Sequence, residues 1–391
     1  MNSKQRVHAA LEGRPVDRMP VAALYSQLVH LDHYEELTGR PQWDQHRWLH
    51  STPAEHLEVF SAIQAAAPFE ILQPQLAPSR QDRERYEFIV REGVPYRHDK
   101  KRDVYESLAT ISGHARDYAA NETQHVFDKA DIDARLKVTR AEDIVASGQN
   151  DYLDAIVAAY GGDHFVLSGG VIGTLYSCGH HMGQANVFSM LIEQPSLIEY
   201  LCHKILEQNI EQIRALARAG GDAIYIDDAT ATSDMISVAH YERFSLPYMQ
   251  EMVREIHRLG HKAIIIYFGG VQDRLEQLAS IGADALCAET SMKGYVNDIG
   301  EMARRIGDRV SLFANIDPVG VIEQADDEGL QAEIRRQVAA GRQARGFLIS
   351  PASPITPGTP LSRIQRFIQL AQKLGILLTE GTTASGRAPR P

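Results

Sequence analysis

The sequence predicts an α/β fold, a (β/α)8 TIM barrel with a β-hairpin inserted between its second and third strand units. Three observations lead to this prediction. From about residue 160 onward, a helical stretch that ends in glycine is followed by a short apolar run, and this unit recurs six times. The apolar runs show little alternation, as expected of parallel strands buried on both faces. Two earlier apolar runs bring the total to eight.

The expected strands follow one another at intervals that leave room for a helix between them. The first two lie in RMPVAALYS (18–26), after the helix that opens the chain, and in PFEILQPQ (68–75), after a helix around 53–66. The other six lie in YGGDHFVLSGG (160–170), AGGDAIYIDD (219–228), LGHKAIIIYFGG (259–270), IGADALCAET (281–290), IGDRVSLFANIDP (306–318) and ARGFLISPASP (344–354). With right-handed crossovers, eight such units close into a barrel. An open doubly wound sheet would usually carry a glycine-rich phosphate turn after its first strand, and this sequence has none there.

The stretch between the second and third units is too long for a simple crossover. Residues 80–125 combine alternation with turn signals, which predicts a β-hairpin insertion that serves as a lid over the barrel mouth. We expect residues 1–379 to form one domain. The last segment, 380–391, is rich in Gly, Ser, Thr and Pro and is expected to be a disordered tail.

The composition is that of an ordinary globular protein with a large core. Of the 391 residues, 44% are hydrophobic and 23% are charged, and the net charge of -11 argues against nucleic acid or an anionic membrane as a partner. We see no apolar run of about 20 residues and no signal-peptide core at the start of the chain. Cys178, Cys202 and Cys287 are an odd, widely spaced set, which favours free thiols in a reducing compartment. The expected localisation is cytoplasmic.

In a (β/α)8 barrel the active site lies at the C-terminal ends of the strands. Carboxylates, amides, hydroxyls and phenols occupy the expected ends, and no lysine or arginine does. The residues expected there include Tyr25, Glu70, Gln73, Tyr176, Asp227, Asp228, Tyr267, Glu289, Asn315 and Ser353. An acidic mouth without cations is a poor host for polyanions. It suits a neutral or cationic substrate, or a metal held by oxygen ligands.

Several of these residues have a structural alternative. Asp228 could cap the next helix, and Glu289 could be a buried partner of a neighbouring strand. Asn315 lies in ANIDP, a pattern typical of a turn held by side-chain bonds to the backbone. Tyr267 could equally be a packing residue. Asp227, which closes a hydrophobic strand, is the residue for which a functional role is favoured.

A denser cluster lies in YSCGHHMGQ (176–184), which offers Cys178, His180 and His181. The C-x-H-H spacing is not usual for zinc, and no second cluster accompanies it. We therefore predict that this segment, together with Tyr176, lines a substrate pocket and binds no metal.

Several stretches resemble the uroporphyrinogen decarboxylase superfamily along essentially the whole chain. They are SKQRVHAALEGRPVDRMPV, GGDAIYIDDA, ISVAHYERFSLPYMQEMVREIHRLGHK, LASIGADAL and ANIDP, and the final PITPGTPLSRIQRFIQLAQ is similar to the corrinoid-linked members above all. The resemblance implies a (β/α)8 barrel, in agreement with the strand pattern. It does not by itself select one activity.

For the decarboxylase itself, the resemblance implies arginines after the first strand that meet the substrate carboxylates. That place reads AALYSQLVH here, with no arginine. The family's active-site aspartate falls on Glu70 and its active-site tyrosine near Cys178. Because the tetrapyrrole substrate carries eight carboxylates, a mouth without cations disfavours it. A decarboxylase-like carboxy-lyase is therefore the alternative function.

Members of the superfamily that activate a thiol hold zinc through His-x-Cys at one strand end and Cys at another. These places fall on Ile266, Phe268 and the vicinity of Ser353. No zinc is expected at this site, since none of the three can bind it as the family does.

The remaining branch resembles methyltransferases that move a methyl group from a small methoxylated or N-methyl donor to a corrinoid protein. We expect Asp227, Glu289 and Tyr267 to be catalytic, with Tyr25, Tyr176 and Phe268 walling the donor. The implied cofactor is a corrinoid (cobalamin) carried by the partner protein, and a homodimer is one assembly that the sequence allows. A non-catalytic barrel that binds a ligand or a corrinoid protein is a further alternative.

Overall fold

The computed structural model describes residues 1–108, 128–292, 294–352 and 354–383. Seven parallel strands form one sheet in the order β1-β5-β6-β7-β8-β9-β10. They are β1 (Ile71–Leu72), β5 (Phe165–Ile172), β6 (Ala223–Asp228), β7 (Lys262–Tyr267), β8 (Ala285–Ala288), β9 (Ser311–Phe313) and β10 (Phe347–Leu348). Six of these strands lie inside segments that the sequence predicts to be strands, and β5 begins inside its predicted segment (160–170) and continues two residues past it.

The two outer strands of the sheet approach one another through the segment that follows the first helix. Val21 bridges to Ile349 in parallel, and the N–H of Ala22 donates to the carbonyl of Ile349 at 3.0 Å. On the other side, the N–H of Glu70 donates to the carbonyl of Val21 at 3.0 Å. The first predicted strand thus contributes a single bridging residue, and the sheet curls into a TIM-barrel-like fold.

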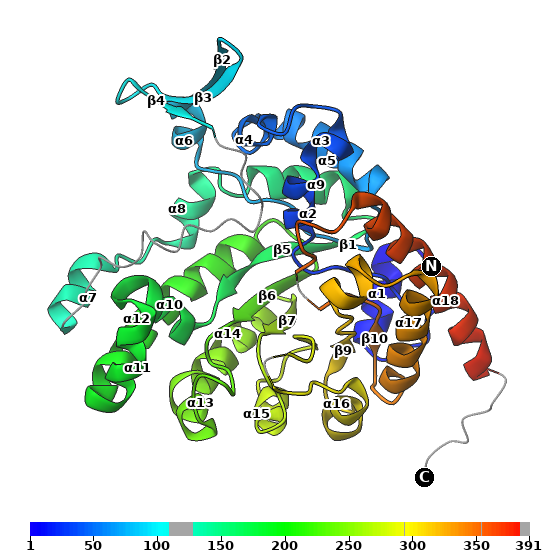
Figure 1. Cartoon of the computed structure of the whole chain (residues 1–391). Coiled ribbons are helices and arrows are strands. Elements are labelled where there is room, and N and C mark those ends of the chain that lie inside the picture. The colour runs from blue at the N-terminus through cyan, green and yellow to red at the C-terminus, as the bar shows by residue number, and fades with distance from the viewer. Residues whose placement is uncertain (109–127, 293, 353, 384–391) are drawn as a thin grey trace.

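Helices surround this sheet, as Figure 1 shows for α12, α14, α16 and α17. The helices before the third strand of the sheet are α1 (Ser3–Leu11), α2 (Ser26–Asp32), α3 (Tyr34–Thr38), α4 (Asp44–Trp48), α5 (Pro53–Ala66), α6 (Arg80–Arg85), α7 (Lys129–Arg135), α8 (Ala141–Ala146), α9 (Asp151–Tyr160), α10 (Thr174–Met182), α11 (Gln184–Glu193) and α12 (Pro195–Ala217). The later ones are α13 (Val238–Phe244), α14 (Leu246–Arg258), α15 (Leu275–Ser280), α16 (Ile299–Ile306), a π-helical turn η2 (Pro318–Glu323), α17 (Asp327–Gly341) and α18 (Leu361–Thr383). Helix α18 continues past residue 379, where the tail was expected to begin.

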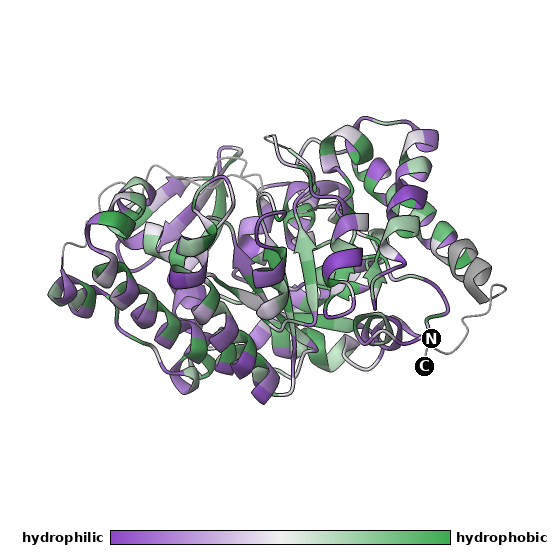
Figure 2. Cartoon of the chain, turned by 90° about the horizontal axis from the view of Figure 1, so that it is seen from below, coloured by the Kyte–Doolittle hydropathy of each residue, from purple (hydrophilic) through white to green (hydrophobic). Residues whose placement is uncertain are grey.

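Alternation along each strand divides the core into two layers. The interior layer of the curled sheet contains Leu167, Ile264, Ile266 and Phe313. Strand residues on the opposite face, such as Ile265, pack against the helices. Hydropathy shows the same division, with apolar strands at the centre and polar outer faces on the helices (Figure 2). Side chains on one face of a strand therefore share an environment that their sequence neighbours do not.

A smaller sheet lies between β1 and β5 in the chain. Strands β2 (Tyr86–Arg91), β3 (Val94–Asp99) and β4 (Val104–Ser107) form it with antiparallel pairing throughout. Figure 1 shows this sheet projecting away from the parallel one. Residues 109–125 of the predicted insertion lie outside the described residues, and the role of the insertion as a lid stays a prediction.

None of the helices in the described ranges combines the length and the apolar character that crossing a membrane requires.

Candidate active site

Asp227 and Tyr25 meet inside the curled sheet, although β6 and the segment that carries Tyr25 are not neighbours in it. Ala223 faces the interior, so the period of two along β6 brings Tyr225 and Asp227 to the same face. The hydroxyl of Tyr25 donates a hydrogen bond to Oδ2 of Asp227. Both side chains are buried, with Asp227 only 7% exposed. The predicted mouth thus contains a carboxylate held by a phenol.

The backbone of Tyr25 supports a special role for this residue. Its φ of 60° and ψ of 28° lie in the left-handed region, which residues other than glycine rarely adopt. Tyr25 directly precedes α2, so this conformation turns the chain from the barrel wall into the helix. Such strain persists where surrounding contacts fix it, and it clusters at functional sites.

Aromatic rings surround this carboxylate–phenol pair. The ring centroid of Tyr25 lies 5.8 Å from that of Tyr225, with the ring planes at 75°, and 6.4 Å from that of Phe268, with the planes at 33°. Tyr225 and Phe268 are half-buried and pack against the interior cluster. The mouth therefore has an aromatic wall next to a carboxylate.

Glycine in β5 makes room for this wall. A Cβ on Gly170 would overlap the ring carbons of Tyr225, so only glycine leaves the space that this ring occupies. The pairing of β5 with β6 is irregular between Leu167 and Gly170, and Gly169 has a φ of 120°. A bulge at this point re-aims the strand beside the site.

Asp228 points away from this mouth. It is fully buried on the outer face of β6, where its Oδ2 accepts a hydrogen bond from the hydroxyl of Ser245 at 3.2 Å. Burial raises the pKa of Asp228 to about 7, and the neighbouring charge of Asp227 adds to the rise. The prediction that Asp228 contacts the substrate is wrong in its placement, because a one-residue step along a strand reverses the face.

Tyr267 is corrected for the same reason. It pairs in register with Asp228, and its hydroxyl donates to the carbonyl of Ala231 at 3.2 Å. The buried guanidinium of Arg274 donates to the same carbonyl at 3.0 Å and to that of Ile236 at 2.8 Å. Burial holds the pKa of the Tyr267 phenol well above its ordinary value. Tyr267 and Arg274 thus hold the loop after β6 in place from the helix-facing side of the sheet.

Glu289 lies at the end of β8 in a network of loop contacts. Its Oε2 accepts hydrogen bonds from the N–H of Gly269 at 2.7 Å and from the hydroxyl of Tyr295. The side chain of Asn297 donates to the carbonyls of Gly269 and Glu289 at 3.0 and 2.9 Å and accepts from the N–H of Val271 at 3.1 Å. Glu289 thereby joins the loops after β7 and β8, and its catalytic role stays a prediction.

Asn315 extends this network and has its side chain fully occupied by it. Its Nδ2 donates to the carbonyls of Glu289 and Asn297 at 3.1 and 2.9 Å, and its Oδ1 accepts from Gln337 at 2.8 Å. The expected substrate contact of Asn315 is therefore replaced by a structural role, with the amide tying two loops together.

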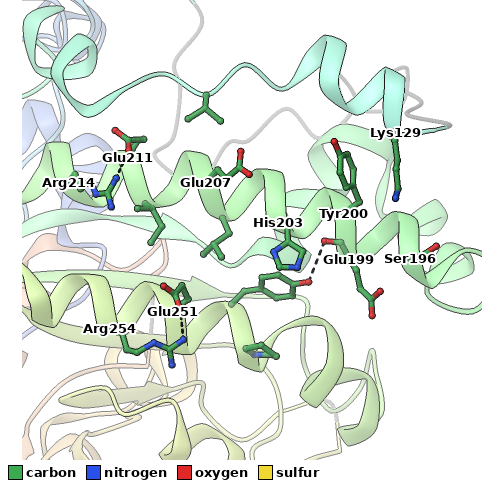
Figure 3. A pocket seen from close by; sticks show the side chains of 15 residues that line it. Lys129, Ser196, Glu199, Tyr200, His203, Glu207, Glu211, Arg214, Glu251 and Arg254 are labelled. Carbon is green, nitrogen blue, oxygen red and sulfur yellow. Dashed lines mark hydrogen bonds and ion pairs between the residues drawn. The ribbon is translucent and has the colours of Figure 1, made fainter.

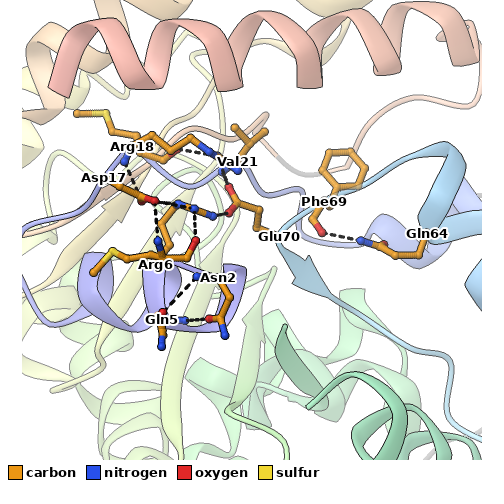
Figure 4. Close-up of polar contacts among 11 residues, drawn as sticks. Asn2, Gln5, Arg6, Asp17, Arg18, Val21, Gln64, Phe69 and Glu70 are labelled. Carbon is orange, nitrogen blue, oxygen red and sulfur yellow. Dashed lines mark hydrogen bonds and ion pairs between the residues drawn. The ribbon is translucent and has the colours of Figure 1, made fainter. Parts of the chain in front are cut away.

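Glu70 lies at the opposite end of the sheet from the mouth. It precedes β1 and accepts hydrogen bonds from Arg6, from Arg18 at 2.6 Å and from the N–H of Val21 at 2.8 Å. Figure 4 shows these contacts, with Asp17 on the far side of Arg6. The placement of Glu70 in a substrate site is wrong, because this carboxylate anchors α1 below the sheet.

The predicted residues of α10 divide between two environments. Cys178 is buried in the outer core, 3.5 Å from the sulfur of Cys202, and burial raises the pKa of its thiol well above the ordinary value. It does not reach a substrate site. Tyr176 and His180 are half-buried with ring centroids 5.2 Å apart, and burial lowers the pKa of His181. The substrate-binding role of Tyr176, His180 and His181 stays a prediction.

Two further predicted residues follow strands of the sheet. Gln73, just after β1, is 2% exposed, and neither polar atom of its side chain has a hydrogen-bond partner among the described residues. Ser353 lies outside the described residues.

Apolar side chains occupy the places of the family's zinc ligands that the structure describes. Ile266 is buried in the interior cluster, and Phe268 packs against it. Across the described ranges, no three His, Cys, Asp or Glu side chains gather closely enough to hold a metal ion.

A groove of about 1110 Å³ lies elsewhere, on the outer helical layer between α12 and α14 (Figure 3). Tyr200 and Tyr248 line it, together with charged residues that pair with one another. Arg214, for example, lies 2.6 Å from Glu211. The groove is remote from the strand ends and offers no converging set of reactive groups.

Three residues at or beside the mouth were not predicted: Tyr225, Tyr295 and Asn297. Tyr225 could have been found, since it lies two residues before Asp227 in a strand and must share its face. Tyr295 and Asn297 carried no comparable signal, because loop contacts across three strand ends depend on the tertiary fold.

Comparison with known proteins gives a family and a fold. The family described as uroporphyrinogen decarboxylase (URO-D) matches residues 119–374. The uroporphyrinogen decarboxylases of Pseudomonas fluorescens and Coxiella burnetii are 30% and 28% identical over 191 and 193 residues, covering 48% of this chain in both cases and 51% and 50% of those proteins. The chain thus matches about half the length of these curated relatives. The solved structure of a methyltransferase from Methanosarcina mazei is 18% identical, with a TM-score of 0.66, over 96% of this chain and 99% of that one.

Proposed function

We propose, from the premise that the chain belongs to the uroporphyrinogen decarboxylase family, that it is an enzyme that transfers a methyl group from a small methylated donor to a corrinoid protein. The observation that carries this proposal is the buried Tyr25–Asp227 pair beside the rings of Tyr225 and Phe268. This arrangement can hold and orient a small, partly apolar donor. The fold shared with a methyltransferase from Methanosarcina mazei is compatible with it.

The chain's own contribution would be positioning. Holding a donor in a near-attack geometry can supply much of the barrier reduction in a displacement at a methyl carbon. Asp227 orients the polar end of the donor, and the aromatic wall excludes water from the methyl group. The corrinoid of the partner protein would supply a cobalt nucleophile as acceptor. Glu289 keeps the loop at Gly269 and Gly270 in place, so the mouth is preorganised before the donor arrives.

A second candidate is decarboxylation of a tetrapyrrole, which the names of the curated relatives favour. The electrostatics of the strand ends oppose it. Within the four residues that follow each strand of the parallel sheet, and within 23–26, the sequence contains no lysine or arginine. A substrate with eight carboxylates would enter such a mouth without counter-charges.

Methyl transfer is tested by mixing the purified chain with a methylated donor and a corrinoid protein reduced to the cobalt(I) state. Methylation changes the visible spectrum of the corrinoid, so turnover is followed by absorbance. We expect turnover that falls at least a hundredfold in Asp227→Asn, since the donor loses its orienting charge. Asp308→Asn is the matched control, because this carboxylate is 81% exposed and lies on an outer turn.

The same preparation is assayed for loss of carboxyl groups from uroporphyrinogen. Decarboxylation without corrinoid methylation would overturn the proposal in favour of the second candidate. Ligand binding that survives while neither reaction occurs would identify a non-catalytic binding barrel.

A further inference from the structure

We infer that the mouth binds a quaternary ammonium head group, held against the rings of Tyr25, Tyr225 and Phe268 with Asp227 as its counter-charge. This inference rests on the proposed function and narrows its donor from methoxylated or N-methyl compounds to fully methylated ammonium compounds. Three independent features of the described residues support it.

The first feature is the arrangement of the rings. Tyr25 and Tyr225 stand nearly perpendicular with centroids 5.8 Å apart, so their faces form a corner. A cation in that corner can lie within about 6 Å of both centroids, the range in which an aromatic face attracts it. Phe268, 6.4 Å from Tyr25, adds a third ring. Aromatic cages of this kind are the common way in which proteins recognise methylated ammonium groups.

The second feature is the carboxylate within the cage. Asp227 is 7% exposed and accepts the hydrogen bond of Tyr25, which fixes the phenol's proton on the carboxylate side. A carboxylate in a desolvated site attracts a cation more strongly than it would in water. A quaternary ammonium donates no hydrogen bond, so it needs a nearby negative charge and ring faces rather than a further acceptor.

The third feature is that the cage is built at some cost to the backbone. Tyr25 adopts a left-handed conformation with a φ of 60°, and Gly170 is the residue that leaves space for the Tyr225 ring. Strain and close approach beside the carboxylate indicate that the position of these two rings is constrained.

The chemistry of the transfer agrees with a quaternary donor. When the bond from nitrogen to the methyl carbon breaks, nitrogen keeps the electron pair and leaves as a neutral tertiary amine. The methyl group passes to a cobalt(I) corrinoid, which supplies the electron pair of the new bond. No proton is required, whereas an alkoxide leaving from a methoxyl donor would need one. The hydroxyl protons of Tyr25 and Tyr267 are both engaged with protein acceptors.

The test compares two probes of nearly equal shape, choline and its neutral isostere 3,3-dimethylbutan-1-ol, by isothermal titration calorimetry on the full chain. We expect choline to bind at least tenfold more tightly. Asp227→Asn should abolish this preference, and Tyr225→Leu should weaken choline binding about fivefold or more. Tyr225→Phe keeps the aromatic face and should stay within about twofold of the parent chain. Tyr105→Leu, in the projecting sheet and 37% exposed, is the control that should change nothing.

Equal affinity for the two probes, absence of choline binding, or unchanged choline binding in Tyr225→Leu would overturn the inference. The corrinoid methylation assay separates this result from the proposed function. Methyl transfer from a neutral methoxyl donor without choline binding would refute the ammonium site and leave the methyltransferase intact. Selective choline binding without methyl transfer from any donor would leave the ammonium site intact and refute the methyltransferase.

Discussion

Replacing Glu70 with glutamine should destabilise the whole fold without altering the mouth. The Glu70 side chain is 3% exposed and forms ion pairs with Arg6 and Arg18, whose side chains are 8% and 17% exposed. It also receives the N–H of Val21, the residue that bridges the first and last segments of the curled sheet. Glu70→Gln keeps the shape of the side chain and removes its charge. The NH2 group of the glutamine would then face one of the N–H groups that donate to Glu70, and two donors cannot form a hydrogen bond with each other.

The magnitude follows from what remains unpaired. Removing one partner of a buried ion pair costs about 3 to 5 kcal/mol. Arg6 retains Asp17, and Arg18 is partly accessible to water, so we expect about 3 kcal/mol. The entropy of unfolding is about 2.1 cal/mol/K per residue, or roughly 0.8 kcal/mol/K for the 391 residues of the chain. The melting temperature should therefore fall by about 4 °C.

The assay is thermal unfolding followed by far-ultraviolet circular dichroism. The control is Glu106→Gln, which breaks the ion pair with Arg97 in the projecting sheet, where the two side chains are 57% and 38% exposed. Exposed pairs contribute about 1 kcal/mol or less, so its melting temperature should change by about 1 °C at most. An equal shift in the two variants would refute the claim that Glu70 is a buried structural anchor.

Two other predictions concern residues at and behind the mouth. Because burial raises the pKa of Asp228 to about 7 from an unfolded value near 3.9, the native state binds this proton more tightly and loses stability as pH rises between these values. The melting temperature of Asp228→Asn minus that of the parent chain should increase by about 3 °C between pH 5 and pH 8. A difference that does not change with pH would contradict this. Gly170→Ala should cost about 1 to 3 kcal/mol because the added methyl displaces the Tyr225 ring. When Tyr225 is also replaced by alanine, this loss of stability should largely disappear. Denaturant unfolding measures the loss in both backgrounds. An equal loss in the two would show that Gly170 and Tyr225 do not compete for space.

The strands could be predicted from sequence because each is bounded by local signals. Glycine ends the preceding helix, the apolar run has strand length, and polar residues follow it. Residue Gly260 before β7 and Gly282 before β8 have φ values of 84° and 83°, as such helix ends require. The first strand is harder to predict from sequence, because only one of its residues, Val21, bridges to the sheet. The partner of Val21 is Ile349, which lies far along the chain.

The site could be predicted only where alternation along a strand was enough. Asp227 is the last residue of β6 on the interior face. The same period of two separates it from Asp228 and Tyr267, whose side chains face the helices. The sequence alone does not show which of two adjacent aspartates faces inward until one strand residue is assigned to a layer. Glu70 shows a second limit, since PFEIL does not reveal whether the carboxylate begins or ends its strand. Arg6 and Arg18 settle this from 64 and 52 positions away.

The stretch IIIYFGG shows how one strand end can serve three purposes. Ile266 and Phe268 face the interior and make the mouth apolar and aromatic, while Tyr267 between them fastens the loop after β6 from the other side. Gly269 then accepts the close approach of Thr232 and donates its N–H to Glu289. Residues that bind a ligand and residues that hold the loops therefore alternate along a single strand. A family assignment cannot separate these roles, because it applies to the strand as a whole, whereas the chemistry depends on which face each side chain occupies.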